Sequence, residues 1–184
     1  MDQNMQLERK YCGPGAPVAL TDGAVIEGYA SVFGSRDQGG DTVLAGTYAR
    51  SLKAQAEAGR RIKMLWQHDP TEPIGVWEEV PEDARGLYVK GRLLLDVARG
   101  REAAALIEAG AIDGLSIGYR TVRAEKNDTG QRLLSELELW EVSLVTFPML
   151  EQARVGTKGE SPEVALMRDL AAAFDDARQT LAMT

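Results

Sequence analysis

Cysteine and histidine are almost absent from this chain of 184 residues, since each occurs once, as Cys12 and His68. A single cysteine excludes an intramolecular disulfide, and one cysteine with one histidine cannot build a dedicated zinc site. Long apolar runs are missing as well, because no stretch approaches the roughly 18 to 20 apolar residues that span a bilayer. The N-terminal stretch MDQNMQLERKYCGPG also lacks the apolar core of a secretion signal. We therefore expect no metal, no cofactor and no membrane contact, in a reducing, aqueous compartment.

Positive charge is also in short supply, because 28 acidic residues outnumber 21 Lys and Arg and leave a formal net charge of -7. Nucleic-acid affinity rests mainly on clustered Lys and Arg, so this balance argues against a DNA or RNA partner. The apolar fraction of 44% and the charged fraction of 27% are typical of a soluble globular protein. At this length we expect one domain with a real core.

The chain divides into three parts by composition. Residues 1–20 are expected to be a flexible leader, residues 21–155 a folded domain, and residues 156–184 a linker followed by an amphipathic helix. Ser161 supplies a helix N-cap, and Pro162 suits the first helical position. Such a helix needs a surface to pack on, either its own domain or a helical segment of another chain. Its apolar residues recur at helical spacing and are Val164, Met167, Leu170, Ala171, Phe174 and Leu181.

Most of the domain is expected to be β-structure. Runs rich in β-branched and aromatic residues predict strands over 24–33, 61–68, 74–80, 86–96, 114–126 and 132–147. Helical spacing that ends at a glycine predicts two helices, over 47–58 and 101–110. We therefore predict a mainly β, α+β fold in which helices punctuate the strands.

The single histidine closes one of these predicted strands. Alternation in RIKMLWQH predicts one strand face made of Ile62, Met64, Trp66 and His68. The chain is then expected to turn at DPTEP and to resume as a strand at Ile74. A lone histidine at the end of an apolar stripe serves structure more often than catalysis. Its role therefore depends on what lies beside it in the folded chain.

Gly114–Gly118 has the pattern G-x-S-x-G, with Ser116 at its centre. In α/β-hydrolases this motif forms a sharp strand-to-helix turn, and the histidine comes later in the chain. Here a strand is expected after the serine and the only histidine precedes it, so we reject that fold. Serine chemistry remains compatible with this order, because an imidazole such as that of His68 can remove a hydroxyl proton. The structural alternative is that a serine between glycines serves a tight bend.

A third group normally fixes the imidazole tautomer, and without a second histidine it has to be a carboxylate or an amide. In the strand predicted at 132–147, Glu141 has the parity of Leu137 and Leu139, so an unbroken strand buries its carboxylate on the apolar side. A buried carboxylate is costly without a partner, and Glu141 is therefore expected to satisfy a polar group. Asp69, beside the histidine, is the fallback. A solvated Glu141 at a strand break is the structural alternative.

Four stretches resemble the signature of the phage prohead maturation proteases, namely LWQHDPTEPIG, REAAALIEAG, AIDGLSIGY and LWEVSLVTFP. The resemblance runs from about Val25 to Val155. That family is similar in fold to the herpesvirus assemblins, which implies a closed β-barrel surrounded by helices. By position, His68 matches the family histidine, Ser116 the nucleophilic serine and Glu141 the acid of the E-V-S-L-V segment.

The sequence differs from the assemblins in the segment that stabilises the oxyanion of the tetrahedral intermediate. Assemblins follow the third member of the triad with an arginine pair, whereas the matching stretch here reads FPMLEQ. We expect backbone N–H groups of residues 147–150, or Arg154 through water, to take over this function.

The resemblance also implies an activity and its partners. It implies a serine endopeptidase that cleaves the scaffolding region of the major capsid protein, and itself, inside an assembling procapsid in the host cytoplasm. The particle belongs either to a phage or to a phage-derived gene-transfer agent, and self-association into a dimer or oligomer is compatible with the family. The leader before Thr21 and the linker at 155–160 are the expected self-cleavage sites, because proteases cut exposed, flexible chain. Two alternatives stay open: an inactive capsid-assembly factor on the same fold, and a serine hydrolase of small esters.

Overall fold

The fold is one curled β-sheet with two helices, in a computed structural model that describes residues 8–11, 18–21, 24–37, 39–147 and 155–156. The prediction of a mainly β, α+β fold is confirmed. The helices are α1 (Ala49–Glu57) and α2 (Ala98–Glu108). The strands are β1 (Glu8–Tyr11), β2 (Val18–Thr21), β3 (Val25–Val32), β4 (Asp41–Val43), β5 (Lys63–Trp66), β6 (Asp69–Glu79), β7 (Gly86–Leu93), β8 (Gly114–Lys126), β9 (Arg132–Val145) and β10 (Val155–Gly156).

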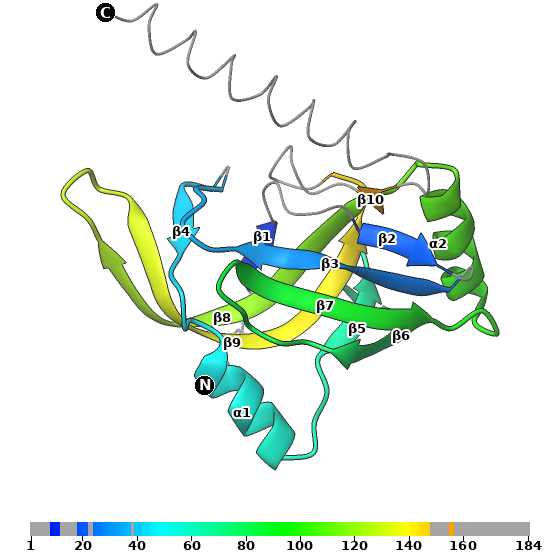
Figure 1. Ribbon diagram of the computed structural model, residues 1–184, viewed down its shortest axis with the longest axis horizontal. Coiled ribbons are helices and arrows are strands. Elements are labelled where there is room, and N and C mark those ends of the chain that lie inside the picture. Colours follow the sequence, from blue (N-terminus) through cyan, green and yellow to red (C-terminus); the bar gives the residue numbers. More distant parts are fainter. Residues whose placement is uncertain (1–7, 12–17, 22–23, 38, 148–154, 157–184) are drawn as a thin grey trace, which may run out of the picture.

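The sheet follows an open path. Its order is β1-β8-β9-β5-β6-β7-β3-β2-β10, and β4 pairs with β9 beside this path. Strand β9 pairs in parallel with β4 and β5 and antiparallel with β8. Figure 1 shows that the sheet curls until β3 and β7 pass in front of β8 and β9. Among the described residues no pairing joins β1 to β10, so the predicted closed barrel is not confirmed.

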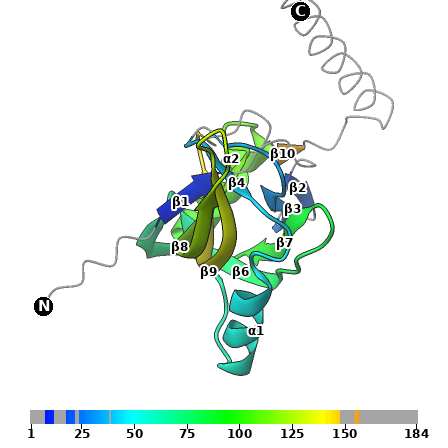
Figure 2. The same cartoon turned by 90° about the vertical axis from the view of Figure 1, so that its left-hand side faces the viewer.

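The two helices contact different parts of the sheet. Helix α1 contacts β9, and α2 contacts β6 and β7, so the helices lie well apart in both views (Figures 1 and 2). The second helix begins at Ala98 rather than at residue 101, and its first turn lies against Leu94, the residue that follows β7. There a Cβ added to Gly100 lies only 2.2 Å from the Leu94 carbonyl oxygen. Neither of the described helices is long and apolar enough to cross a membrane.

Strand β4 lies in a stretch where no strand was predicted. It has three residues and pairs with Arg132–Leu134 at the start of β9. The side chains reinforce this pairing, since Arg132 Nη1 donates to Asp41 Oδ2 at 3.0 Å. A strand this short shows no alternation pattern, so only its tertiary partner identifies it.

The core lies beneath the strands that carry the candidate site. Ile117 of β8, Val142 of β9 and Met64 of β5 are almost fully buried in one apolar cluster. Glycine is required beside Met64 on β6 and β7, because a Cβ at Gly75 lies 2.5 Å from the Arg92 carbonyl oxygen and one at Gly91 lies 2.4 Å from that of Val76. Close packing holds these strands together, and direct pairing of β9 with both β5 and β8 fixes the three strands of the site against one another. Side chains on their other face therefore keep fixed relative positions.

Candidate active site

Ser116 lies within a continuous strand. Strand β8 runs on for ten residues past the serine, to Lys126, so this motif forms no strand-to-helix turn and differs from that of an α/β-hydrolase, as predicted. Ser116 is opposite Ser143 on β9 and opposite Tyr11 on β1. It has 0% exposed surface. The hydroxyl is therefore held at a defined point of the sheet, between two neighbouring strands.

His68 belongs to a tight turn rather than to a strand. Strand β5 ends at Trp66 and pairs there with Asp69, the first residue of β6, so Gln67 and His68 form a two-residue hairpin. Their φ angles of 51° and 63° are both positive, as a type I′ turn requires. The predicted strand face that ends in His68, and the predicted turn at DPTEP, are both wrong. The chain reverses earlier because β9 fixes the turn, with the Gln67 N–H donating to the Leu144 carbonyl at 2.9 Å.

Glu141 is buried, being 5% exposed, but not for the predicted reason. Strand β9 contains one extra residue opposite the Gly118–Tyr119 step of β8, which is a β-bulge. Directly before this bulge the core residues Leu137 and Leu139 hold odd positions, and after it the core residues Val142 and Leu144 hold even ones. The assumption of an unbroken alternation was therefore wrong. By alternation beyond the bulge, Glu141 lies on the face of Ser143 instead of the apolar face.

The structure brings His68, Ser116 and Glu141 into one hydrogen-bonded line. Ser116 Oγ lies 2.6 Å from His68 Nε2, although the two residues are 48 positions apart. On the other side of the ring, His68 Nδ1 lies 2.5 Å from Glu141 Oε1, across 73 positions. An ionised carboxylate only accepts, so it keeps the ring proton on Nδ1 and leaves the Nε2 lone pair to the hydroxyl. This arrangement can remove a proton from Ser116 and stabilise the imidazolium that results.

Gly118 makes room for the Glu141 carboxylate. A Cβ added to this glycine lies 2.0 Å from Glu141 Oε1 and 2.7 Å from its Cδ, distances at which atoms collide. A glycine beside a nucleophile can also serve the close approach of a substrate backbone. In the structure the empty space at Gly118 is filled by the acid itself. A small residue two positions after the serine is thus needed for the acid to reach the imidazole.

Ser143 contacts the line at two points, and sequence reasoning missed it. Its Oγ donates to Glu141 Oε2 at 2.5 Å and accepts the backbone N–H of His68 at 3.2 Å. Its side chain is fully buried. Two signals were present in the sequence: Ser143 has the parity of Glu141 in E-V-S-L-V, and serine is a poor choice for a buried strand unless it is hydrogen-bonded.

Asp69, the fallback for the third group, serves its own turn. Its Oδ1 accepts the Thr71 hydroxyl at 2.6 Å and the Thr71 N–H at 2.8 Å. The bond from the hydroxyl, followed by the bond from the N–H, lowers the pKa of the exposed Asp69 carboxyl below its ordinary value. The structure thus brings Glu141, and not Asp69, to the imidazole.

Several expectations concern residues outside those described. Of the proposed oxyanion donors, Phe147 is 84% exposed, whereas residues 148–150 and Arg154 lie outside the described residues. The same holds for the linker beyond Gly156 and for the C-terminal helix. The oxyanion donors and the division of the chain at residues 20 and 155 therefore stay predictions.

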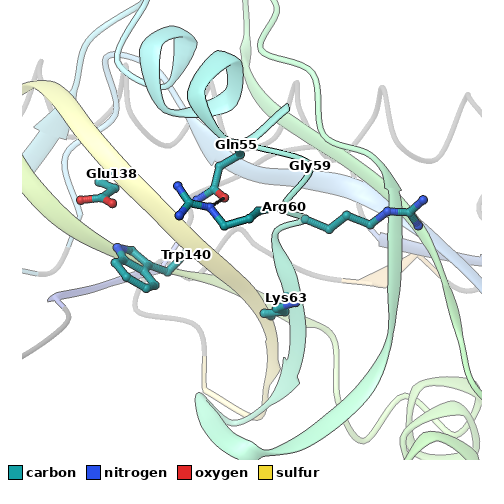
Figure 3. A pocket seen from close by; sticks show the side chains of 7 residues that line it. Gln55, Gly59, Arg60, Lys63, Glu138 and Trp140 are labelled. Carbon is teal, nitrogen blue, oxygen red and sulfur yellow. Dashed lines mark hydrogen bonds between the residues drawn. The ribbon is translucent and has the colours of Figure 1, made fainter. Parts of the chain in front are cut away.

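A hollow of about 470 Å³ lies apart from this line, beside α1 and the start of β5 (Figure 3). Three of its polar residues, Gln55, Arg60 and Glu138, have hydrogen-bond or ion-pair partners. Arg60 Nε donates to Gln55 Oε1 at 3.1 Å, and Glu138 pairs with Arg120 at 2.5 Å. The hollow contains no member of the hydrogen-bonded line, since its lining consists of Gln55, Gly59, Arg60, Arg61, Lys63, Glu138 and Trp140.

Comparison with known proteins gives three findings. A family model described as caudovirus prohead serine protease matches residues 17–167. The prohead protease of Enterobacteria phage HK97 is 30% identical over 168 residues, which cover 90% of this chain and 71% of that protein. A capsid polyprotein of Pseudomonas phage PAJU2 is 34% identical over 102 residues, which cover 51% of this chain and 15% of that protein.

One solved structure extends the comparison to the fold. The capsid assembly protease of bacteriophage T4 superposes with a TM-score of 0.60 at 17% identity, over 76% of this chain and 97% of that one. At this identity the likeness concerns the fold alone.

Proposed function

Because the chain belongs to the caudovirus prohead serine protease family, we propose that it is a serine endopeptidase that matures a viral capsid and that cuts with Ser116. The observation that supports this most is the hydrogen-bonded line from Ser116 Oγ through the His68 ring to Glu141. The proposal also includes the likeness to the herpesvirus assemblins, in which the histidine likewise precedes the serine in the chain.

The proposed reaction follows from the proton positions. Ser116 Oγ attacks a peptide carbonyl carbon while its proton passes to His68 Nε2, and the imidazolium is stabilised by Glu141. When the tetrahedral intermediate collapses, the C–N bond breaks and the leaving amine takes the proton from Nε2. A water molecule then gives a proton to the same nitrogen and attacks the acyl-enzyme; the bond from the acyl carbon to Ser116 Oγ breaks, and Nε2 returns the proton to Oγ as the acid product leaves. Glu141 stays ionised throughout, because its task is to orient and stabilise the ring.

The proposed substrates are the scaffolding region of the major capsid protein and the protease itself. The names of two relatives support this, since one is a prohead protease and the other a capsid polyprotein. Both substrates meet the enzyme inside the assembling procapsid, which is therefore the proposed place of action. Cleavage of the leader is supported by the pairing of β1 with β8, which sets Tyr11 opposite Ser116.

The proposal is tested by producing the protein together with its capsid subunit and weighing both by intact-mass spectrometry. We expect both chains to be shortened with wild-type protein and to keep their full masses with Ser116→Ala. Full masses in both samples favour the alternative of an inactive assembly factor. Turnover of small esters without any shortened chain favours the small-ester hydrolase.

Cleavage of the leader is expected to be intramolecular. Strand β1 lies along the strand of the nucleophile, and Ser116 has no exposed surface, so the leader reaches the hydroxyl more easily than a second molecule does. We therefore expect the rate constant for loss of the leader to stay unchanged over a hundredfold dilution of purified protein, followed by mass spectrometry. As a control, wild-type enzyme is mixed with Ser116→Ala protein, whose leader should persist. A rate constant that falls in proportion to concentration contradicts an intramolecular cut.

A further inference from the structure

We propose that Ser143 is a positioning residue that fixes both His68 and Glu141 for proton transfer. The inference rests on the proposed function and names a fourth residue for the same site. A hydroxyl has one proton and two lone pairs, so it can donate to one group and accept from another at once. Ser143 does both, since its Oγ donates to Glu141 Oε2 at 2.5 Å and accepts the His68 N–H at 3.2 Å.

The Glu141 carboxylate needs this partner because it is buried. One of its oxygens, Oε1, faces His68 Nδ1 at 2.5 Å. The other oxygen also requires a donor because the carboxylate is buried, and Ser143 supplies it. Gly118 of β8 packs closely against the carboxyl group, since a Cβ added to this glycine would lie only 2.0 Å from Glu141 Oε1. Held on these three sides, the carboxylate has one orientation toward the imidazole.

The backbone of His68 needs the same hydroxyl. At a φ of 63° this residue is in a left-handed conformation, which a non-glycine residue keeps only where its surroundings hold it. Two N–H groups of the turn donate to β9: that of Gln67 to the Leu144 carbonyl at 2.9 Å, and that of His68 to Ser143 Oγ. The bond to Ser143 fixes the His68 backbone, and with it the point from which the imidazole side chain extends. Ser143 therefore aligns the base and the acid with one atom.

A buried serine in a strand does not by itself indicate such a role. Ser31 of β3 is equally buried, and its hydroxyl has no hydrogen-bond partner among the described residues. Ser51 is buried too, and within the part of the chain that the structure describes its hydroxyl accepts a backbone N–H, that of Leu139 at 2.9 Å. Ser143 differs because both of its partners belong to the proposed catalytic line. Ser31 thus provides a matched control for the loss of a buried hydroxyl.

The test uses the fact that His68 is the only histidine in the chain. Protein labelled with ¹⁵N-histidine gives one imidazole, and its two nitrogen shifts report which nitrogen carries the proton. For the wild type and for Ser31→Ala we expect a neutral ring with its proton on Nδ1. For Ser143→Ala we expect a mixture of both tautomers. We also expect kcat for cleavage of the capsid subunit to fall about 10- to 100-fold at nearly constant KM, the effect of losing a hydrogen bond to a charged group.

A Ser143→Thr variant keeps the hydroxyl, and it is expected to restore both the Nδ1 tautomer and most of kcat. The proposal is overturned if Ser143→Ala keeps the wild-type tautomer and a kcat within twofold. It is equally overturned if Ser143→Thr loses the tautomer as fully as Ser143→Ala. The nitrogen shifts do not depend on cleavage, so a wild type that cuts nothing but shows a tautomer governed by Ser143 refutes the protease function alone.

Discussion

A Ser116→Ala variant is expected to cleave its polypeptide substrate about 10⁵-fold or more slowly than the wild type, and adding His68→Asn is expected to lower the rate no further. The reason is that the two groups perform one proton transfer over 2.6 Å, so either loss removes the whole step. Asparagine is the suitable replacement at position 68, because it tolerates the left-handed conformation that the turn imposes. The residual rate comes from the oxyanion donors and from substrate binding.

The measurement is a single-turnover time course of capsid-subunit cleavage for the two single variants and the double variant, with Ser31→Ala as the control for a lost buried hydroxyl. The control should retain activity within about twofold, since surface and unpartnered groups contribute little. A double variant that is slower by the product of the two single effects would falsify the shared proton transfer. Circular dichroism of each variant separates lost chemistry from lost fold.

Residue types alone made His68 and Ser116 a candidate pair, because a chain with one histidine offers one imidazole to a candidate serine, and the family resemblance then assigned their roles. The strands that carry the serine and the acid were also predictable, since β8 and β9 are long enough to show their composition over 13 and 14 residues. These sequence patterns do not say how far apart the hydroxyl and the imidazole lie in the folded chain. Whether the hydroxyl and the ring meet depends on β9 lying between β5 and β8, and this order is set by the tertiary fold.

Two local features escaped prediction, and both are tertiary in origin. The turn at Gln67–His68 has no Asn-Gly signal and forms because β9 binds its N–H groups, directly and through the Ser143 hydroxyl. The bulge at Trp140 leaves no mark in composition, yet it alters which positions of β9 face the core. Glu141 was thus selected by a parity that the strand does not keep, and its burial has another cause. Departures from regular structure concentrate where function requires a special geometry.

A Gly118→Ala variant is expected to lower kcat/KM about 10³- to 10⁴-fold, which is the size of effect seen when a carboxylate no longer fixes the tautomer of a catalytic imidazole. The added methyl group lies 2.0 Å from Glu141 Oε1 and 2.9 Å from its Cγ, so the side chain has to move. Because the carboxylate is held at 2.5 Å from both His68 Nδ1 and Ser143 Oγ, any such movement breaks at least one of these bonds. Measurement of kcat/KM on the capsid subunit tests this.

The cause of that loss can be isolated with a second background. Glu141→Ala removes the colliding side chain, so adding Gly118→Ala to it is expected to change kcat/KM by less than about twofold, a strong departure from additivity. If Gly118→Ala instead costs the same factor in both backgrounds, the glycine acts by admitting the substrate backbone. The wild type, the two single variants and the double variant therefore show whether Gly118 makes room for the Glu141 side chain or for the substrate. Only in the first case does the effect of Gly118→Ala depend on the side chain at position 141.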